Sequence, residues 1–386
     1  MSNPSLERYP AFPPDFRFST LDEACKLTFC PSPQPPTTPI TSGPLSLPPL
    51  AAAYFSAFLP RDWCIGFVPH GGYISSLLTQ AGLEFLRLLP TESWGTTLIP
   101  SFRRALSKHI HPLKFQMEFL RRALSDSTCT IRVQATKLGV SYSVLSLSLY
   151  QLTPNTTPPL HHECCTGYVT YTNIPLSEPV KTNPTVVLPP EYPIFPLSLC
   201  TPATSNRTNT FWRVCSNKLT YYVPPTSTQN LALGLVEQWV RWADYPQRRV
   251  GFFPRDMGYI CDMYFPPGEA LLVANGFGER TRWYPTLGYE VELKSLPGDE
   301  SVGWEWLFMR VETRGVRGGR LDVRVQVWGS EEGNGEGEMR LVARGSQVCL
   351  VVPGEKNAKG RGANPLVIKI NRFNHSEARV PKLKNQ

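Results

Sequence analysis

A histidine and two glycines stand directly before a helix-like segment in the first third of the chain. The run at 68–73 reads VPHGGY and continues as ISSLLTQAGLEFL, with apolar residues at helical spacing. Because glycine has no Cβ, Gly71 and Gly72 at a helix N-terminus, directly after His70, would let a ligand or another segment approach free backbone N–H groups. A plain loop that ends where the helix begins is the alternative.

A second group of reactive side chains is the run HHECC at 161–165. Histidine and cysteine are metal-ligand types, but adjacent ligands cannot easily converge on one ion, and zinc sites usually place about two to four residues between paired ligands. We therefore expect a loop at 161–165 and no metal site. His109 and His111 precede a strand-like run, and we expect them in a turn.

The isolated cysteines and the glycine-rich run at 333–338 suggest no separate chemistry. Cys64, Cys129 and Cys349 stand in apolar, strand-like runs, which favours small core residues over nucleophiles. No helix follows GNGEGE at 333–338, so this run is expected to be a hairpin loop and not a phosphate cradle.

The elements that must position these residues fall into two similar halves. In the first half, a predicted helix is followed by three strand-like runs at 113–123, 129–138 and 141–151. The helix carries an apolar stripe at three- and four-residue spacing: Ile74, Leu77, Leu78, Ala81, Phe85 and Leu88. In the second half, an aromatic and apolar stretch precedes strand-like runs at 285–294, 304–314, 319–328 and 339–352.

Two copies of one α+β unit explain this order economically. A long helix against one face of a curled antiparallel sheet is the hotdog architecture. We therefore predict a double hotdog, with two antiparallel sheets that each wrap around a central helix. The predicted organisation is a Pro-rich N-terminal arm at 1–50, an N-terminal hotdog at 51–151, a linker or insertion at 152–210, a C-terminal hotdog at 211–353 and a basic tail at 354–386.

The positive charge of the chain is concentrated at its end. Eight Lys and Arg against two Glu between 353 and 386 carry +6 of the formal net charge of +8. The body is nearly neutral, so we do not expect nucleic-acid binding, and we interpret the tail as a solvated extension.

The compartment is expected to be the cytoplasm. The ten cysteines are scattered along the chain without the spacing of a disulfide framework. The first residues lack the apolar core of a signal peptide, and no run reaches the ~18 apolar residues of a membrane span. The C-terminal KNQ differs from the peroxisomal Ser-Lys-Leu address, although an organelle route by another signal stays open.

Several motifs in this order resemble the type II double-hotdog acyl-CoA thioesterases, in particular the fungal thioesterase-like proteins. In the first half these are DWCIGFVPHGGY, HPLKFQMEFLRRA and KLGVSYSVLSLSLYQ. In the second half they include EQWVRW, GYICDMYFP, WYPTLGYEVELK and LVARGSQVCLVV. The resemblance covers most of 54–151 and 231–355, and it implies hydrolysis of an acyl thioester to a free acid and a thiol.

The resemblance also implies a catalytic set of an aspartate, a threonine and a glutamine in the second hotdog. Carried over by motif, these are Asp262 in GYICDMYFP, Thr286 in WYPTLGYE and Gln347 in LVARGSQVCL. A thioester is already activated, so a water held by a carboxylate can attack it without a Ser-His-Asp nucleophile. Outside the resemblance, Asp262 is as readily a helix-end residue, and Thr286 and Gln347 are ordinary strand residues.

The implied substrate is an acyl-CoA or acyl-carrier thioester, with no cofactor beyond the coenzyme A of the substrate, and a homo-oligomer stays open. His70, Gly71 and Gly72 are predicted to help bind the substrate. A non-catalytic acyl-binding or pathway-accessory protein is the alternative. A hotdog dehydratase would need a histidine paired with a carboxylate, and His70 is the only candidate because 211–352 contains no histidine.

Overall fold

The fold was analysed in a computed structural model of the chain. The structure describes residues 12, 16–31, 52–89, 104, 106–152, 161–174, 190, 192–203, 213–226, 230, 232–278, 282–330 and 332–358. Most of the predicted basic tail, from 359 onward, lies outside the described residues.

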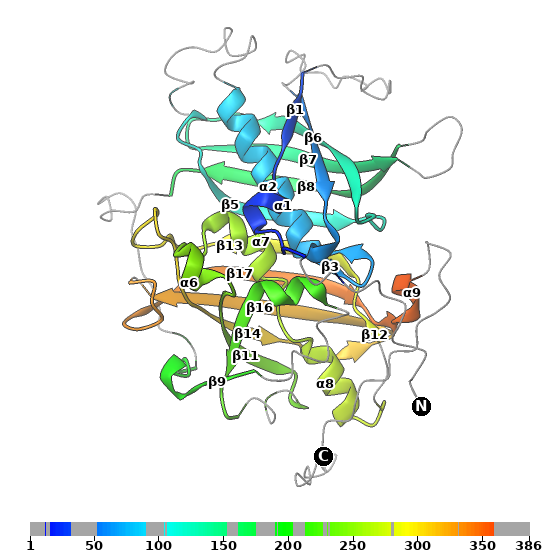
Figure 1. The fold of residues 1–386 in the computed structure, drawn as a ribbon, viewed down its shortest axis with the longest axis vertical. Helices are drawn as coiled ribbons and strands as arrows, with labels where there is room; N and C mark the ends of the chain where they lie inside the picture. The colour runs from blue at the N-terminus through cyan, green and yellow to red at the C-terminus, as the bar shows by residue number, and fades with distance from the viewer. Residues whose placement is uncertain are drawn as a thin grey trace.

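The first half consists of one long helix against an antiparallel sheet, as predicted. Helix α2 (Gly71–Leu88) buries its apolar stripe, and it crosses the strands in Figure 1. The strands are β2 (Ala52–Leu59), β5 (His111–Phe119), β6 (Ser127–Lys137), β7 (Tyr142–Leu152) and β8 (His161–Thr172). Alternating buried and exposed residues along β6 and β7 place one face of the sheet against α2.

Strand β8 corrects two expectations. The HHECC run at 161–165 begins this strand and is not a loop, and β8 pairs with both β5 and β7. The range 152–210, expected to be a linker, therefore supplies a strand to the first sheet. The strand was not recognised because its sequence lacks a regular alternation of buried and exposed residues. The adjacent residues Cys164 and Cys165 are both buried, since the pairing register shifts between Leu149 and Tyr150 on β7.

The second half has the predicted meander but no long central helix. Its principal strands are β10 (Leu219–Val223), β11 (Leu235–Trp242), β13 (Thr286–Leu293), β14 (Leu307–Glu312), β16 (Arg320–Ser330) and β17 (Met339–Leu350). The helical segment is broken into η5 (Pro254–Asp256), α7 (Met257–Ile260) and α8 (Pro267–Ala274). Prolines at 266 and 267 fix φ and remove N–H donors, so α7 cannot continue into α8.

The two predicted sheets are one continuous sheet, which corrects the expectation of two separate ones. Its strand order is β1-β2-β6-β7-β8-β5-β13-β17-β16-β14-β11-β10-β9, and the halves meet where β5 pairs with β13 (Figure 1). The register at the junction sets Phe115 opposite Val291 and Met117 opposite Tyr289. Backbone hydrogen bonds therefore join the halves into a single core.

Part of the predicted arm is folded onto this core. Helix α1 (Leu21–Ala24) has a capping box from Thr20 and Glu23, and β1 (Thr28–Cys30) pairs with β2. The Pro-rich run from 32 to 50 lies outside the described residues. The remaining short elements are η1 (Arg61–Trp63), β3 (Cys64–Ile65), β4 (Val68–Pro69), η3 (Leu197–Leu199), β9 (Thr201–Pro202), η4 (Val214–Lys218), α6 (Tyr245–Arg248), β12 (Arg282–Trp283), β15 (Val316–Arg317), β18 (Val352–Pro353) and α9 (Glu355–Ala358).

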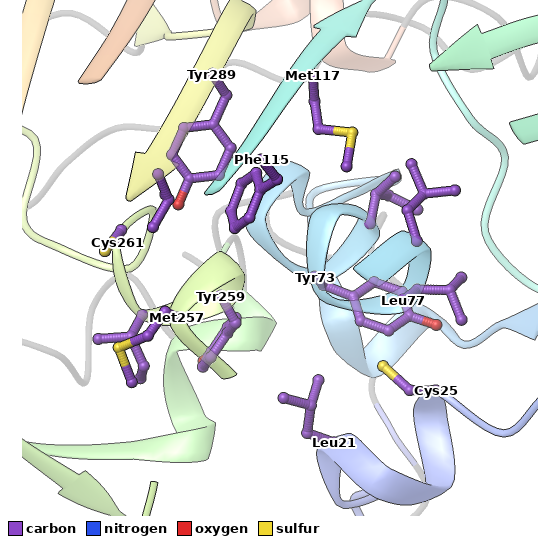
Figure 2. Close-up of a cluster of buried hydrophobic side chains, with 14 of the residues drawn as sticks. Leu21, Cys25, Tyr73, Leu77, Phe115, Met117, Met257, Tyr259, Cys261 and Tyr289 are labelled. Atoms are coloured by element: carbon purple, nitrogen blue, oxygen red, sulfur yellow. The ribbon is translucent and has the colours of Figure 1, made fainter. Parts of the chain in front are cut away.

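The core between the halves is centred where α2 meets α7. Figure 2 shows Tyr73 and Leu77 from α2, Met257 and Tyr259 from α7, and Phe115 and Tyr289 from the junction strands. The backbones approach closely because glycines face each other. A Cβ at Gly72 would lie 2.5 Å from the carbonyl oxygen of Gly258, and a Cβ at Gly258 would lie 2.8 Å from Ser76 Oγ.

Candidate active site

A cavity of about 420 Å³ opens beside this helix contact. Asp262, Thr286 and Gln347 all line it, together with His70 and Gly71 at the start of α2. Much of the wall is apolar: Ile65, Ile74, Phe119, Leu149, Leu321 and Val323. The three residues that the resemblance indicated therefore share one cavity between the halves of the molecule. An apolar pocket with a few polar groups is typical of a small-molecule site.

Asp262 follows α7 and extends its carboxylate to the N-terminus of α2. The backbone N–H of Gly72 donates to Asp262 Oδ2 at 2.6 Å, so the carboxylate of one half caps the helix of the other. The carboxylate is almost enclosed, with 12% of the side chain exposed. Since Asp262 also lines the cavity, its remaining lone pairs are available to a water or a substrate there.

Gln347 holds the second oxygen of the carboxylate. Its Nε2 donates to Asp262 Oδ1 at 2.9 Å and to the carbonyl oxygen of Cys261 at 3.2 Å. The hydroxyl of Tyr264 donates to Gln347 Oε1 at 3.0 Å. The Tyr264 hydroxyl therefore fixes the direction of the amide, because a flipped Gln347 would present an oxygen to the carboxylate. Tyr264 was missed by sequence reasoning, although it stands two residues after Asp262 in the same motif.

Thr286 lies in the same cavity but is not bonded directly to Asp262 or Gln347. Its hydroxyl lies 3.7 Å from Cys349 Sγ, and Cys349 Sγ lies 3.6 Å from Gln347 Oε1. The strand register explains this, since β13 and β17 set Thr286 opposite Cys349. Burial raises the pKa of the Cys349 thiol to about 12, so this cysteine is not a nucleophilic thiolate at neutral pH.

His70 contacts the catalytic candidate as well as the cavity. Its Nε2 lies 3.1 Å from the Asp262 carbonyl oxygen and 3.3 Å from Asp262 Oδ2. Both neighbours are acceptors, which assigns the ring proton to Nε2 and makes His70 a donor. Burial lowers the pKa of His70, so the ring is neutral at neutral pH. The pairing of a histidine with a carboxylate that a hotdog dehydratase would need is therefore present at His70 and Asp262, with 2% of the His70 side chain exposed.

The two glycines of HGG have different surroundings. Gly71 lines the cavity, and a Cβ there would lie 3.1 Å from Asp262 Oδ2 and 3.2 Å from Phe119 Cζ. Gly72 is not among the lining residues, since it donates to Asp262 and faces Gly258. The first glycine thus leaves space beside the carboxylate, and the second allows the two helices to meet.

Three further charged side chains at the cavity, Glu269, Arg282 and Arg213, were missed by sequence reasoning. Glu269 on α8 accepts from the Arg282 guanidinium at 2.5 Å and from the Tyr284 hydroxyl, which ties α8 to β12 at the cavity wall. Arg213 lines the cavity directly before η4. None of the three stands in a motif of the family resemblance, and the sequence before Arg213 has no periodic pattern.

The described ranges contain no group of three His, Cys, Asp or Glu side chains able to hold a metal ion. Within the same ranges, no helix is long and apolar enough to cross a membrane.

Two sequence profiles of one family match the chain. The profile of the acyl-CoA thioesterase N-terminal domain matches residues 59–172, and that of the C-terminal domain matches residues 200–351. The N-terminal profile covers α2 and strands β5 to β8, the C-terminal profile covers strands β9 to β17, and residues of both ranges line the cavity. The chain belongs to the acyl-CoA thioesterase family with two hotdog domains.

One curated protein and several solved structures are similar to this chain. The thioesterase-like protein TwmA of Talaromyces wortmannii is 23% identical over 353 residues, which covers 78% of this chain and 88% of TwmA. A candidate thioesterase II from Thermobifida fusca has a similar fold, with a TM-score of 0.55 and 19% identity over 77% of this chain and 92% of that one. A protein of unknown function with a hot dog fold from Alicyclobacillus acidocaldarius is also similar, with a TM-score of 0.56 and 14% identity over 87% of this chain and 98% of that one.

Proposed function

We propose that this protein hydrolyses acyl thioesters by attack of a water molecule that Asp262 activates. The observation that carries the proposal is the setting of Asp262, held by Gly72 and Gln347 at the wall of an apolar cavity. Membership of the acyl-CoA thioesterase family supports an acyl-CoA or acyl-carrier substrate. The apolar residues of the cavity would surround the acyl chain.

In the proposed reaction, Asp262 accepts a proton from the water as its oxygen attacks the thioester carbon. Gln347 keeps the carboxylate oriented, and the Thr286 hydroxyl in the same cavity helps to position the water. The tetrahedral intermediate then collapses, the C–S bond breaks, and the proton on Asp262 passes to the departing thiolate. The products are a free acid and a thiol, and Asp262 is again ionised.

The developing negative charge on the thioester oxygen needs a hydrogen-bond donor. Gly71 is the first residue of α2, an 18-residue helix, and it lines the cavity without a Cβ. The backbone N–H of Gly71 at this positive helix end is the donor that we propose for the oxyanion. The neighbouring Gly72 N–H is already bonded to Asp262.

The test is release of free thiol from short- to long-chain acyl-CoAs by the full chain and by Asp262→Asn. Asparagine keeps an oxygen for Gly72 N–H but cannot accept the proton, so we expect kcat to fall by about 10³-fold with binding of a non-hydrolysable acyl-CoA thioether retained. Unchanged turnover in Asp262→Asn would contradict the assignment of Asp262. Binding without any thiol release by the wild type would instead indicate an acyl-binding protein.

A further inference from the structure

Arg213 lines the cavity and forms no salt bridge with an acidic side chain of the described residues. The backbone of Arg213 is fixed, because its carbonyl oxygen accepts from the N–H of Ser216 at 2.8 Å and from the Ser216 hydroxyl at 2.7 Å. Its guanidinium reaches the cavity wall, where Nη2 lies 3.9 Å from Met263 Sδ, and Nε is buried without a hydrogen-bond partner. A thioether sulfur is only a weak acceptor.

This setting differs from that of another arginine at the same cavity. Arg282 is neutralised by Glu269 at 2.5 Å. Arg213 is half-buried, and its Nε is buried in a largely apolar cavity without a hydrogen-bond partner. Removing part of a cation from water is costly unless it finds an anion or several hydrogen bonds, so an anion in the cavity would stabilise this guanidinium. The structure supplies none from the described residues, which points to a ligand.

The position of Arg213 relative to Asp262 indicates which part of a ligand it would meet. Arg213 contacts the side chain of Met263, the residue after Asp262. Burial lowers the pKa of His70, and the positive charge of Arg213 adds a smaller effect in the same direction. His70 in turn contacts Asp262. Arg213 is therefore beside the reacting end of the cavity, where the acyl group and the thioester would lie.

We propose that Arg213 binds an oxyanion on the acyl group, so that the preferred substrates are thioesters of acids that carry a second carboxylate. This inference rests on the proposed function, because it assumes that Asp262 marks the thioester position. A planar guanidinium binds a carboxylate through two parallel hydrogen bonds. The phosphates of a coenzyme A carrier are the other source of an oxyanion, but the pantetheine arm holds them away from the thioester carbon.

The test measures binding without turnover, by titration calorimetry with thioether analogues of coenzyme A. Each S-(ω-carboxyalkyl) compound is paired with an S-alkyl compound of equal length, over a series of chain lengths. We expect the carboxylated member to bind wild type about 10- to 100-fold more tightly at the matching length. Arg213→Met should abolish this preference, and Arg213→Lys should restore part of it.

Arg324→Gln is the matched control, because Arg324 is exposed on β16 and its loss changes the net charge equally. It should keep the wild-type preference, and melting curves should show that each variant is folded. The same pairs built on N-acetylcysteamine, which has no phosphate, separate the two oxyanion sources. A preference that persists there supports the acyl carboxylate.

Two results would overturn the proposal. The first is that Arg213→Met weakens binding of every coenzyme A thioether but of none of the N-acetylcysteamine compounds. Arg213 would then bind the phosphates of coenzyme A. The second result is that Arg213→Met changes the affinity for carboxylated and neutral ligands of both carriers equally, or changes neither. Arg213 would then not recognise a carboxylate on the acyl group. Because no step involves hydrolysis, a failure of the proposed reaction does not affect the interpretation of these binding measurements.

Discussion

At the scale of single residues, the carboxylate of Asp262 is held from three sides. The Gly72 N–H and the Gln347 amide bond its two oxygens, and His70 Nε2 approaches Oδ2. These contacts fix the position and direction of the carboxylate at the cavity wall. The orientation of Gln347 depends on Tyr264, which makes Tyr264 a positioning residue of the proposed reaction.

We expect Tyr264→Phe to lower kcat by about 10-fold with little change in KM. The variant removes the hydroxyl that fixes Gln347 Oε1, so Gln347 orients the Asp262 carboxylate less well. Loss of this buried hydrogen bond should also lower the free energy of unfolding by about 1 kcal/mol. Tyr171→Phe is the control, because it removes a buried hydroxyl that donates to the Thr79 carbonyl oxygen at 2.7 Å in the first half. Equal kcat values for the two variants would show that Tyr264 has only a structural role.

At the scale of elements, the site is created by the contact between α2 and α7. The short helix α7 presents Gly258 to Gly72, and one turn later the chain places Asp262 at the N-terminus of α2. The Ser76 hydroxyl accepts from the Tyr259 N–H at 3.0 Å and locks the two helices in register. The spacing of the helices thus sets the position of the carboxylate.

We expect Gly72→Ala to lower the free energy of unfolding by about 3 kcal/mol and to reduce thiol release. The new Cβ would lie 2.5 Å from the Gly258 carbonyl oxygen and 2.7 Å from Asp262 Cβ, and neither atom can rotate away. Urea unfolding followed by tryptophan fluorescence measures the loss. Gly315→Ala is the control, since a Cβ there has no atom within 4 Å. Similar stabilities for the two variants would refute the close-approach explanation.

At the scale of the whole molecule, segments from three parts of the chain are joined by one buried and two exposed ion pairs. Lys218 of the second half donates to Asp62 Oδ2 at 2.6 Å and to the Ser19 carbonyl oxygen at 2.7 Å. Asp22 on α1 bonds both Arg248 and Arg255. These contacts hold the N-terminal segment across the boundary between the halves, next to η5 and its buried Asp256.

The stability of the whole molecule should depend on the ionisation of Asp256. Burial raises the pKa of Asp256 to about 6 from an ordinary value of 3.8, against the opposing effects of Arg255 and the Phe253 N–H. The folded state therefore binds the Asp256 proton more tightly than the unfolded state does. This difference contributes on the order of 3 kcal/mol to the free energy of unfolding below pH ~4, and the contribution is lost as pH rises to about 6.

Urea unfolding of wild type and Asp256→Asn between pH 4 and 7 measures this contribution. Asparagine retains an oxygen for the Phe253 N–H but does not titrate, so the stability of the variant relative to wild type should rise with pH across this window. A constant difference between the two proteins would mean that Asp256 is already ionised at the lower pH.

The lowered pKa of His70 acts in the opposite sense, because its contribution falls as pH drops below about 6.5. That contribution is common to both proteins and cancels in the comparison.

The sequence alone determined the helix at 71–88, the meanders of both halves and the hotdog class, because periodicities of 3.6 and 2 are local properties of the chain. Its motifs also indicated Asp262, Thr286 and Gln347. Only the tertiary structure joined the two sheets through β5 and β13, placed β8 in a stretch that reads as a linker, and set Asp262 on the N-terminus of α2. Local patterns do not encode these contacts, since Gly72 and Asp262 are 190 residues apart and meet only when the halves pack.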